Sequence, residues 1–236
     1  ASGLSQVATP LSYSTVETID QNGVLTYELS SSPVGPAVVS LANEGDITVA
    51  GDVNVVALGT GSLDEGAGVA FVEGFDQSAL GDDALATIDN SGSFNVLANV
   101  TVESDNVSTG VAIASGIDQS ATGYATQATV VFANGTTTPT SFTGSATAVG
   151  SGTATLDNSG SISVIATVDS HGDQVPFAGA PASAVGQVAA GTHASVSIDN
   201  SGSIVAVGSL SSSGGTAFGG VGAIGFQQVD GADVGA

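Results

Sequence analysis

Residues 198–204 read IDNSGSI, and this phrase returns almost unchanged along a chain of 236 residues. Close copies are IDNSGSF at 88–94 and LDNSGSI at 156–162, and looser copies are LANEGDI at 41–47 and FANG at 132–135. Each copy holds one Asn, and these are Asn43, Asn90, Asn134, Asn158 and Asn200, at spacings of 47, 44, 24 and 42 residues. Self-similarity at such a period indicates a repeat protein, in which successive units stack on one another.

Residues on both sides of the phrase alternate between apolar and polar. Ile162, Val164, Ala166 and Val168 follow one copy at every second position. This period of two, with Val and Ile, predicts strands that bury one face. Asp, Asn, Ser and Gly between the strands are turn residues, and Gly allows backbone angles that other residues avoid. We therefore expect the phrase to be a corner between two strands.

A second phrase precedes the corners. It reads FDQSALG at 75–81, IDQSATG at 117–123 and, more loosely, VGQVAAG at 185–191. Its Gln lies 13 or 15 residues before the Asn of a corner, whereas the other part of each repeat varies in length. Each repeat is then strand, corner, strand, loop and strand, with a loop that tolerates insertions.

Strands that recur at a fixed corner predict an all-β fold, a repeat β-solenoid of the parallel β-helix kind. Coils would stack about 4.8 Å apart, so that equivalent Asn side chains form a hydrogen-bonded ladder. An antiparallel β-sandwich is the alternative. The spacing leaves open whether one coil has 42–47 residues or about half as many. We expect the repeat domain over 37–236, and over 1–36 an N-terminal segment that caps the first coil or pairs with a neighbouring subunit as an assembly arm.

The charge balance excludes several functions. The chain has 22 acidic residues and neither Lys nor Arg, so we expect no binding to nucleic acid or to anionic membranes. It has no Cys, which removes disulfides and thiolate chemistry. No apolar run approaches the roughly 18 residues of a membrane-spanning helix. The opening ASGLSQ is typical of residues just after a signal-peptidase cleavage site, which predicts a secreted protein.

The repeats resemble the NSG-repeat regions, rich in Gly, Ala and Ser, of large secreted bacterial surface proteins such as autotransporter passengers and filamentous adhesins. The phrases IDNSGSI, LDNSGSI and IDQSA carry this resemblance, which covers residues 38 to about 229. It implies an extracellular or cell-surface β-solenoid with a structural or adhesive role.

Polar clusters give little support for catalysis. DSHGD at 169–173 places His171 between two carboxylates, but a metal would need further ligands, so a polar loop is the simpler interpretation. His193 is expected on an exposed strand face. Asp82 and Asp83 form a carboxylate pair of the kind used in acid–base catalysis, and a solvated turn explains them as well. We therefore predict no enzyme and assign no catalytic or cofactor-binding residues.

The abundance of Asp and Glu would suit calcium, which takes oxygen ligands. Asp89, Asp157 and Asp199 share one position of the repeat, where stacked carboxylates would either repel one another or share a cation. No known calcium-loop motif is present, so we predict no cofactor and leave metal ligands unassigned, with Ca²⁺ as the alternative.

Together these features predict a secreted structural protein that assembles with copies of itself, head to tail, into an extracellular filament or matrix. The alternative is an adhesin fragment that binds a sugar or a surface through its variable loops. The five corner Asn residues are the predicted structural site.

Overall fold

A computed structural model describes residues 1–19, 24–58, 65–132, 139–214 and 218–232. These residues form 17 β-strands and no helix. The strands make three parallel sheets and one antiparallel sheet. The prediction of an all-β repeat solenoid is confirmed, and the antiparallel sandwich is wrong. Within the described ranges no helix is long and apolar enough to cross a membrane.

Each parallel sheet contains one strand from each of the four coils, and the long sheet holds a fifth strand. The short sheet holds β4 (Ala37–Asn43), β7 (Asp83–Asn90), β12 (Ser151–Asn158) and β15 (His193–Asn200). The middle sheet holds β5 (Asp46–Ala57), β8 (Ser93–Ser104), β13 (Ser161–His171) and β16 (Ser203–Ser213). The long sheet holds β1 (Ser2–Ala8), β6 (Glu65–Leu80), β9 (Val107–Thr122), β14 (Gln174–Gly191) and β17 (Phe218–Ala232).

One coil runs through a short-sheet strand, the corner, a middle-sheet strand and a long-sheet strand, and then enters the next coil. Asn158 and Asn200, which are 42 residues apart, are direct neighbours on successive coils. A single coil of about this length is therefore the repeat, not two of half the length. The interval from Asn90 to Asn158 is 68 residues because it also contains a hairpin.

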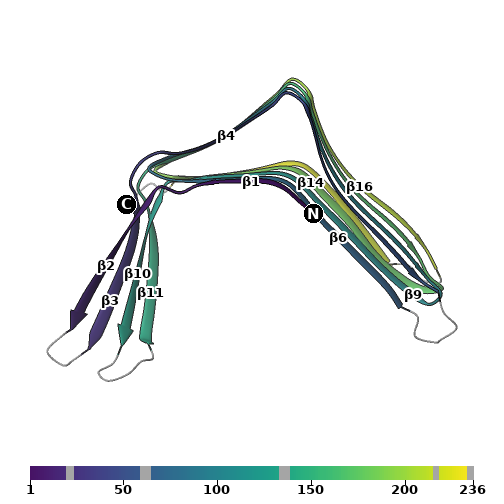
Figure 1. The fold of residues 1–236 in the computed structure, drawn as a ribbon, viewed down its shortest axis with the longest axis horizontal. Helices are drawn as coiled ribbons and strands as arrows, with labels where there is room; N and C mark the ends of the chain where they lie inside the picture. The colour runs from purple at the N-terminus through teal and green to yellow at the C-terminus, as the bar shows by residue number, and fades with distance from the viewer. Residues whose placement is uncertain (20–23, 59–64, 133–138, 215–217, 233–236) are drawn as a thin grey trace.

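The coils form an arch when viewed along the stack, with the short and middle sheets meeting at its top and the long sheet lining the inner side (Figure 1). Each long-sheet strand bends midway. At the bend two successive residues are buried, as at Gly74 and Phe75 or Gly116 and Ile117, so the burial alternation changes phase. One long strand can therefore pack its first half on the middle sheet and its second half on the short sheet.

Two apolar cores lie on either side of this bend. The larger core joins the middle and long sheets with side chains such as Val96, Val100, Ile162 and Val168. The smaller core, under the short sheet, is mostly Ala, including Ala79, Ala86 and Ala121. Small side chains allow the two layers to approach closely there, which explains why Ala recurs in the repeats.

The fourth sheet, named the hairpin sheet, is built from insertions. It holds β2 (Leu11–Ile19), β3 (Leu25–Pro33), β10 (Tyr124–Phe132) and β11 (Pro139–Ala148) in the order β11-β10-β3-β2. The first hairpin follows β1 and the second follows β9, so they leave the solenoid two coils apart and pair through β3 and β10. Residues 1–36 are thus divided, because β1 belongs to the long sheet and pairs in parallel with β6.

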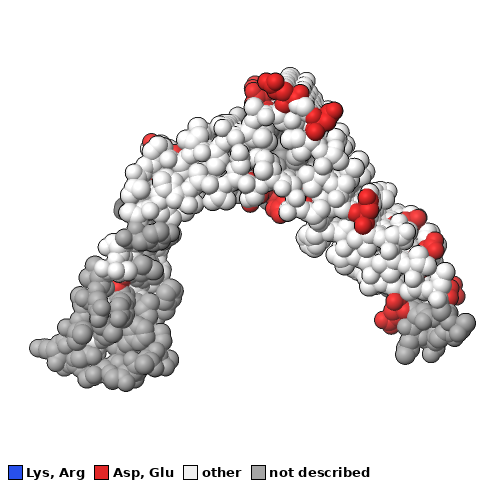
Figure 2. Space-filling view, in the orientation of Figure 1, with Lys and Arg blue, Asp and Glu red and all other residues white. Residues whose placement is uncertain are grey.

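Acidic side chains gather at the top of the arch and along the middle-sheet arm (Figure 2). The top is the corner where the short sheet passes into the middle sheet, next to Asp89, Asp157 and Asp199.

Candidate functional site: two side-chain ladders and the open coil edges

An Asn ladder runs through the corners of all four coils. Asn43 donates from Nδ2 to Oδ1 of Asn90 at 2.7 Å, Asn90 donates to Asn158 at 2.6 Å, and Asn158 donates to Asn200 at 2.6 Å. The donor is always on the earlier coil, so the ladder has a fixed polarity. The first three Asn side chains are buried, whereas Asn200 lies exposed on the last coil.

Each buried rung also bonds the backbone. The same Nδ2 groups donate to the carbonyl oxygens of Ser93 at 3.2 Å, Ser161 at 3.4 Å and Ser203 at 3.2 Å, each on the next coil. Because amide and carbonyl groups cost free energy when buried without partners, each rung fixes the coil above it in one register.

Corner glycines are needed for stacking. A Cβ on Gly92 would lie 2.0 Å from the Gly45 carbonyl oxygen, and Cβ atoms on Gly160 and Gly202 would lie 2.0 Å from the carbonyl oxygen of the preceding corner. No corner glycine has a positive φ. The expectation that these glycines supply unusual backbone angles is therefore wrong. They are needed because a side chain would collide with the backbone of the preceding coil.

A Gln ladder crosses the long sheet with the opposite polarity. Nε2 of each later Gln donates to Oε1 of the one before, along Gln6, Gln77, Gln119, Gln187 and Gln228, at 3.1, 2.9, 2.8 and 2.8 Å. The three inner Gln side chains also donate to backbone carbonyls of short-sheet strands at 3.2 Å, which ties the two sheets together.

The sequence reasoning found three of these Gln residues as a recurring phrase but missed the ladder and its two ends. GLSQVA at 3–8 and GFQQVD at 225–230 share a Gly three residues before the Gln and an apolar residue two before it. That spacing was the available signal. This pattern spans only four residues, and the residues that follow it vary between copies, so it is hard to recognise.

Four of the five predicted corner Asn residues form the Asn ladder. Asn134 lies outside the described residues, and the described ladder passes directly from Asn90 to Asn158. Between these two coils the chain makes the hairpin β10–β11, and Asn134 follows the end of β10 in the sequence.

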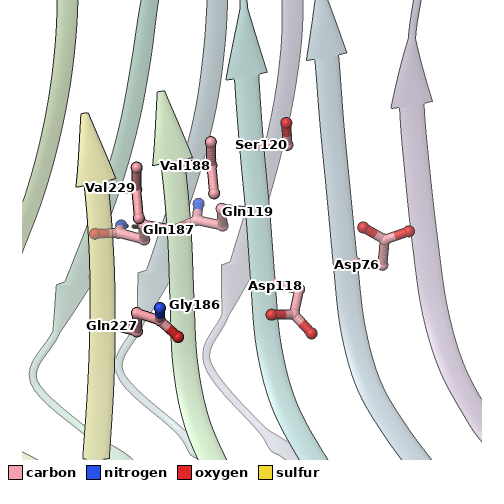
Figure 3. A pocket seen from close by; sticks show the side chains of 9 residues that line it. All are labelled: Asp76, Asp118, Gln119, Ser120, Gly186, Gln187, Val188, Gln227 and Val229. Carbon is pink, nitrogen blue, oxygen red and sulfur yellow. Dashed lines mark hydrogen bonds between the residues drawn. The ribbon is translucent and has the colours of Figure 1, made fainter. Parts of the chain in front are cut away.

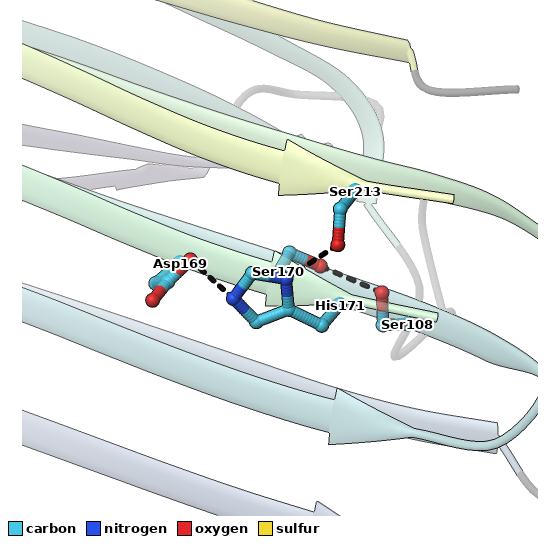
Figure 4. Close-up of polar contacts among 5 residues, drawn as sticks. All are labelled: Ser108, Asp169, Ser170, His171 and Ser213. Atoms are coloured by element: carbon cyan, nitrogen blue, oxygen red, sulfur yellow. Dashed lines mark hydrogen bonds and ion pairs between the residues drawn. The ribbon is translucent and has the colours of Figure 1, made fainter. Parts of the chain in front are cut away.

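His171 contacts two side chains (Figure 4). Its Nε2 lies 2.8 Å from Oδ1 of Asp169 on the same strand, and its Nδ1 lies 2.6 Å from Oγ of Ser213 on β16. Carboxylate, imidazole and hydroxyl follow one another here as they do in a hydrolase triad. The nearby Gly172 N–H, however, donates to the Ser213 carbonyl oxygen at 3.1 Å, so it is not free to stabilise an oxyanion. The three residues pin the end of two neighbouring strands.

Of the other predicted polar positions, Asp82 and Asp83 have structural contacts. Oδ1 of Asp83 accepts from Ser151 Oγ at 2.8 Å, and the Asp82 backbone bonds Gly35 and Ser151 on the coils at either side. His193 is exposed at the start of β15, and Asp173 is exposed after β13. Asp82 and Asp83 therefore join coils at the turn, rather than forming an isolated carboxylate pair.

The predicted Asp row exists as a stack. Asp89, Asp157 and Asp199 are paired in register on β7, β12 and β15, and all three are exposed. The corresponding residue of β4 is Ala42. Among the described residues no group of three or more His, Cys, Asp or Glu side chains is placed to hold a metal ion.

A shallow groove of about 270 Å³ lies on the outer face of the long sheet near its last strands (Figure 3). Its walls include Asp76, Asp118, Val188 and Gln227. Oδ2 of Asp118 accepts from Ser115 Oγ at 2.7 Å. The groove ends at β17, the last described strand of the long sheet. A further strand paired with β17 would therefore change the shape of the groove.

Both ends of the described solenoid leave strand edges open. At the last coil the inward side chains Val221 and Phe226 are 58% and 65% exposed, whereas Ala180 and Val185, their neighbours on β14, are fully buried. At the first coil Leu41 and Ile47 are only partly buried. We name these surfaces the tail edge (β15, β16 and β17) and the head edge (β4, β5 and β1 with β6).

Comparison with known proteins adds no relative: no family model, no curated protein and no solved structure matches this chain.

Proposed function

We propose that this chain is a secreted structural protein whose solenoids join head to tail into an extracellular filament or matrix. The observation that carries the proposal is that the head edge and the tail edge match in register and hydrogen-bonding polarity, and that stacking them would add no carboxylate to the Asp89, Asp157 and Asp199 row. Exposed strand edges pair readily with other strands, and a contact between two different surfaces of the same chain propagates into a polymer.

The Asn ladder shows the matching polarity. At the tail edge, the one contact of Asn200 Nδ2 among the described residues is with the Gly202 carbonyl oxygen, at 3.5 Å. At the head edge, Oδ1 of Asn43 accepts from the Gly45 N–H at 3.2 Å and takes no rung from an earlier coil among the described residues. A second copy stacked in register would supply the missing rung, with Asn200 donating to Asn43.

Stacking two copies would not place another carboxylate next to Asp199. Asp199 would face Ala42 of the second copy, so the row of like charges would be interrupted at the join. Asp46 accepts from Ser93 on its own next coil, and Ser203 is the tail-edge residue at the same position as Ser93. Ser203 of one copy would lie beside Asp46 of the next, on the side opposite to Ser93, within reach of the same carboxylate.

Gly45 supports a coil stacked in front of β4. Within 4 Å of a Cβ built on Gly45 there is no atom, and its φ is not positive, so this chain by itself does not require Gly there. In the other corners Gly is required because the preceding coil places a carbonyl oxygen 2.0 Å away. A second copy would place the carbonyl of Gly202 at the same distance from Gly45.

The test compares Gly45→Ala with Gly222→Ala. Gly222 is equally open, but its position on β14 is filled by Pro181, so a side chain fits there in a stack. Both variants should melt like the original protein as single chains, and only Gly45→Ala should lose assembly in light scattering and negative-stain microscopy. High salt should favour assembly of the original chain, because it screens 22 acidic side chains.

Two results would count against the proposal. A Gly45→Ala chain that forms the same filaments as the original would show that the corners do not stack at the join. An original chain that stays monomeric at neutral pH in molar salt would remove the proposal altogether. The adhesin alternative stays a prediction, since two of the loops that vary between repeats, 59–64 and 133–138, lie outside the described residues.

A further inference from the structure

Two strands of this chain occupy equivalent places at opposite ends of the long sheet. Gln6 of β1 pairs with Gln77, and Gln228 of β17 pairs with Gln187, so both strands continue the same Gln ladder. The short and middle sheets have four strands, whereas the long sheet has five. If two copies stack with β4 on β15 and β5 on β16, the long sheet has one strand too many at each join.

The edges of the long sheet show which parts of β1 and β17 would occupy the same layer at the join. Ala1 and β1 bond residues 71–79 of β6, and no described strand lies beside Ala67–Ala70 on that edge. The residues of β17 at the register of Ala67–Val72 are Phe218–Ala223. Phe218–Val221 of β17 therefore lies at the register of the uncovered part of the β6 edge, and the rest of β17, from Gly222 onward, competes with Ala1 and β1.

The spacing of the hairpins agrees with an arrangement in which β1 of a second copy lies in the same layer as β17. In this chain hairpins leave the solenoid after β1 and after β9, which are two coils apart. If β1 of a second copy lies in the layer of β17, its hairpin follows two coils after β10–β11. The hairpin sheet then continues from copy to copy, with β2 of the second copy next to β11.

Asp230 disfavours β17 in the long-sheet layer that both β17 and β1 of a second copy could occupy. It pairs with Ala189, on the face where Ala79, Ala121 and Ala189 are fully buried. In the isolated chain Asp230 is exposed because no coil covers it. Inside a join its carboxylate would be buried among Ala side chains, which is unfavourable without a partner. At the same position β1 carries Ala8.

We propose that the join is a strand exchange, in which β1 of the incoming copy takes the place of Ile224–Asp230 of β17 and pairs with β14. This inference rests on the proposed head-to-tail function and specifies its contact. Gln6 of the second copy then bonds Gln187 directly, Ala8 lies beside Ala189, and Val7 lies beside Val188.

Engineered disulfides test this arrangement, since the chain has no Cys. Val7 and Val188 are 64% and 42% exposed, so Val7→Cys and Val188→Cys chains can be mixed under assembly conditions and oxidised. Within one chain β1 and β14 are three strand spacings apart in the long sheet, about 14 Å, which is too far for a disulfide. A reducible two-chain band on a gel is the expected result, and each single variant alone should not give it.

Two other mixtures report the alternatives. Ser78→Cys with Val229→Cys would crosslink if β17 kept its place and displaced β1, and Val7→Cys with Val229→Cys would crosslink if β1 stacked on β17. Crosslinking of either pair instead of Val7 with Val188 would overturn the strand exchange while leaving head-to-tail assembly intact. Filaments in microscopy with no crosslink in any mixture would also overturn it. Absence of any association would instead remove the proposed function.

Asp230→Ala tests the physical reason. Without the carboxylate the second half of β17 can stay in the join, so the crosslink should shift from the Val7–Val188 pair toward the Ser78–Val229 pair. Asp173→Ala, at an exposed position after β13, is the matched control and should leave the crosslinks unchanged. An unchanged pattern in Asp230→Ala would refute the role given to this carboxylate.

Discussion

The Asn ladder can be tested at its most buried rung by Asn158→Leu, which keeps a side chain of similar size but removes its amide. Asn158 is fully buried. Its amide accepts from Asn90 at 2.6 Å and donates to Asn200 at 2.6 Å and to the Ser203 carbonyl oxygen at 3.2 Å. The change therefore removes three hydrogen bonds that link three successive coils.

At a net value of roughly 1 kcal/mol for each hydrogen bond, the free energy of unfolding should fall by about 3 kcal/mol. Asn90 Nδ2 keeps its contact with the Ser161 carbonyl oxygen at 3.4 Å, which limits the loss. For a chain of this size 1 kcal/mol corresponds to roughly 2–4 °C, so the melting temperature should fall by about 6–12 °C.

Thermal unfolding followed by circular dichroism measures this shift, with Asn200→Leu as the control in the same ladder. Asn200 is exposed, accepts one short bond from Asn158 and makes a 3.5 Å contact with Gly202, so its loss should cost only about 1 kcal/mol. Equal melting temperatures for the two variants would refute the view that buried rungs hold the coils together.

Three further outcomes are expected from the same geometry. Gly160→Ala should destabilise the folded chain by about 1–3 kcal/mol, because its Cβ would meet a backbone oxygen at 2.0 Å, and chemical denaturation should show it beside an unaffected Gly222→Ala. Asp157→Asn should raise stability by about 0.5 kcal/mol at low salt, since Asp157 is paired with two other Asp residues; a gain that persists unchanged in molar salt would argue against charge repulsion. Chymotrypsin should spare Phe75 and Phe94, which are 1% and 3% exposed, and mass spectrometry that finds early cuts at either one would contradict packed coils.

Much of the architecture could be predicted because its signals are local. The apolar alternation around Ile162 and Val164 lies on one strand, and the Asp-Asn-Ser-Gly corner is a continuous phrase. A strand that alternates and a corner that recurs are sufficient to predict stacked parallel coils. The predicted rung Asn43, in the divergent copy LANEGDI, also lies at its place in the ladder.

Other features depended on which distant residues become neighbours. Gln6 and Gln77 are 71 residues apart, and no local pattern shows that their amides meet. The three strands per coil, the role of Gly92 as a contact for the coil below, and the equivalence of β1 and β17 all follow from register between coils.

The β-strand periodicity, the corner chemistry and the lack of Lys and Arg could be predicted from the sequence, because each is a property of neighbouring residues or of composition. The length of a coil, the opposite polarities of the Asn and Gln ladders and the pairing of the two hairpins became clear in the folded chain alone. These depend on strand register, which is set by packing between residues far apart in the chain, such as Asn158 with Asn200 and Ser31 with Thr126. The inward position of Asp230 belongs to this second group, since only its pairing with Ala189 shows that a joined coil would bury it.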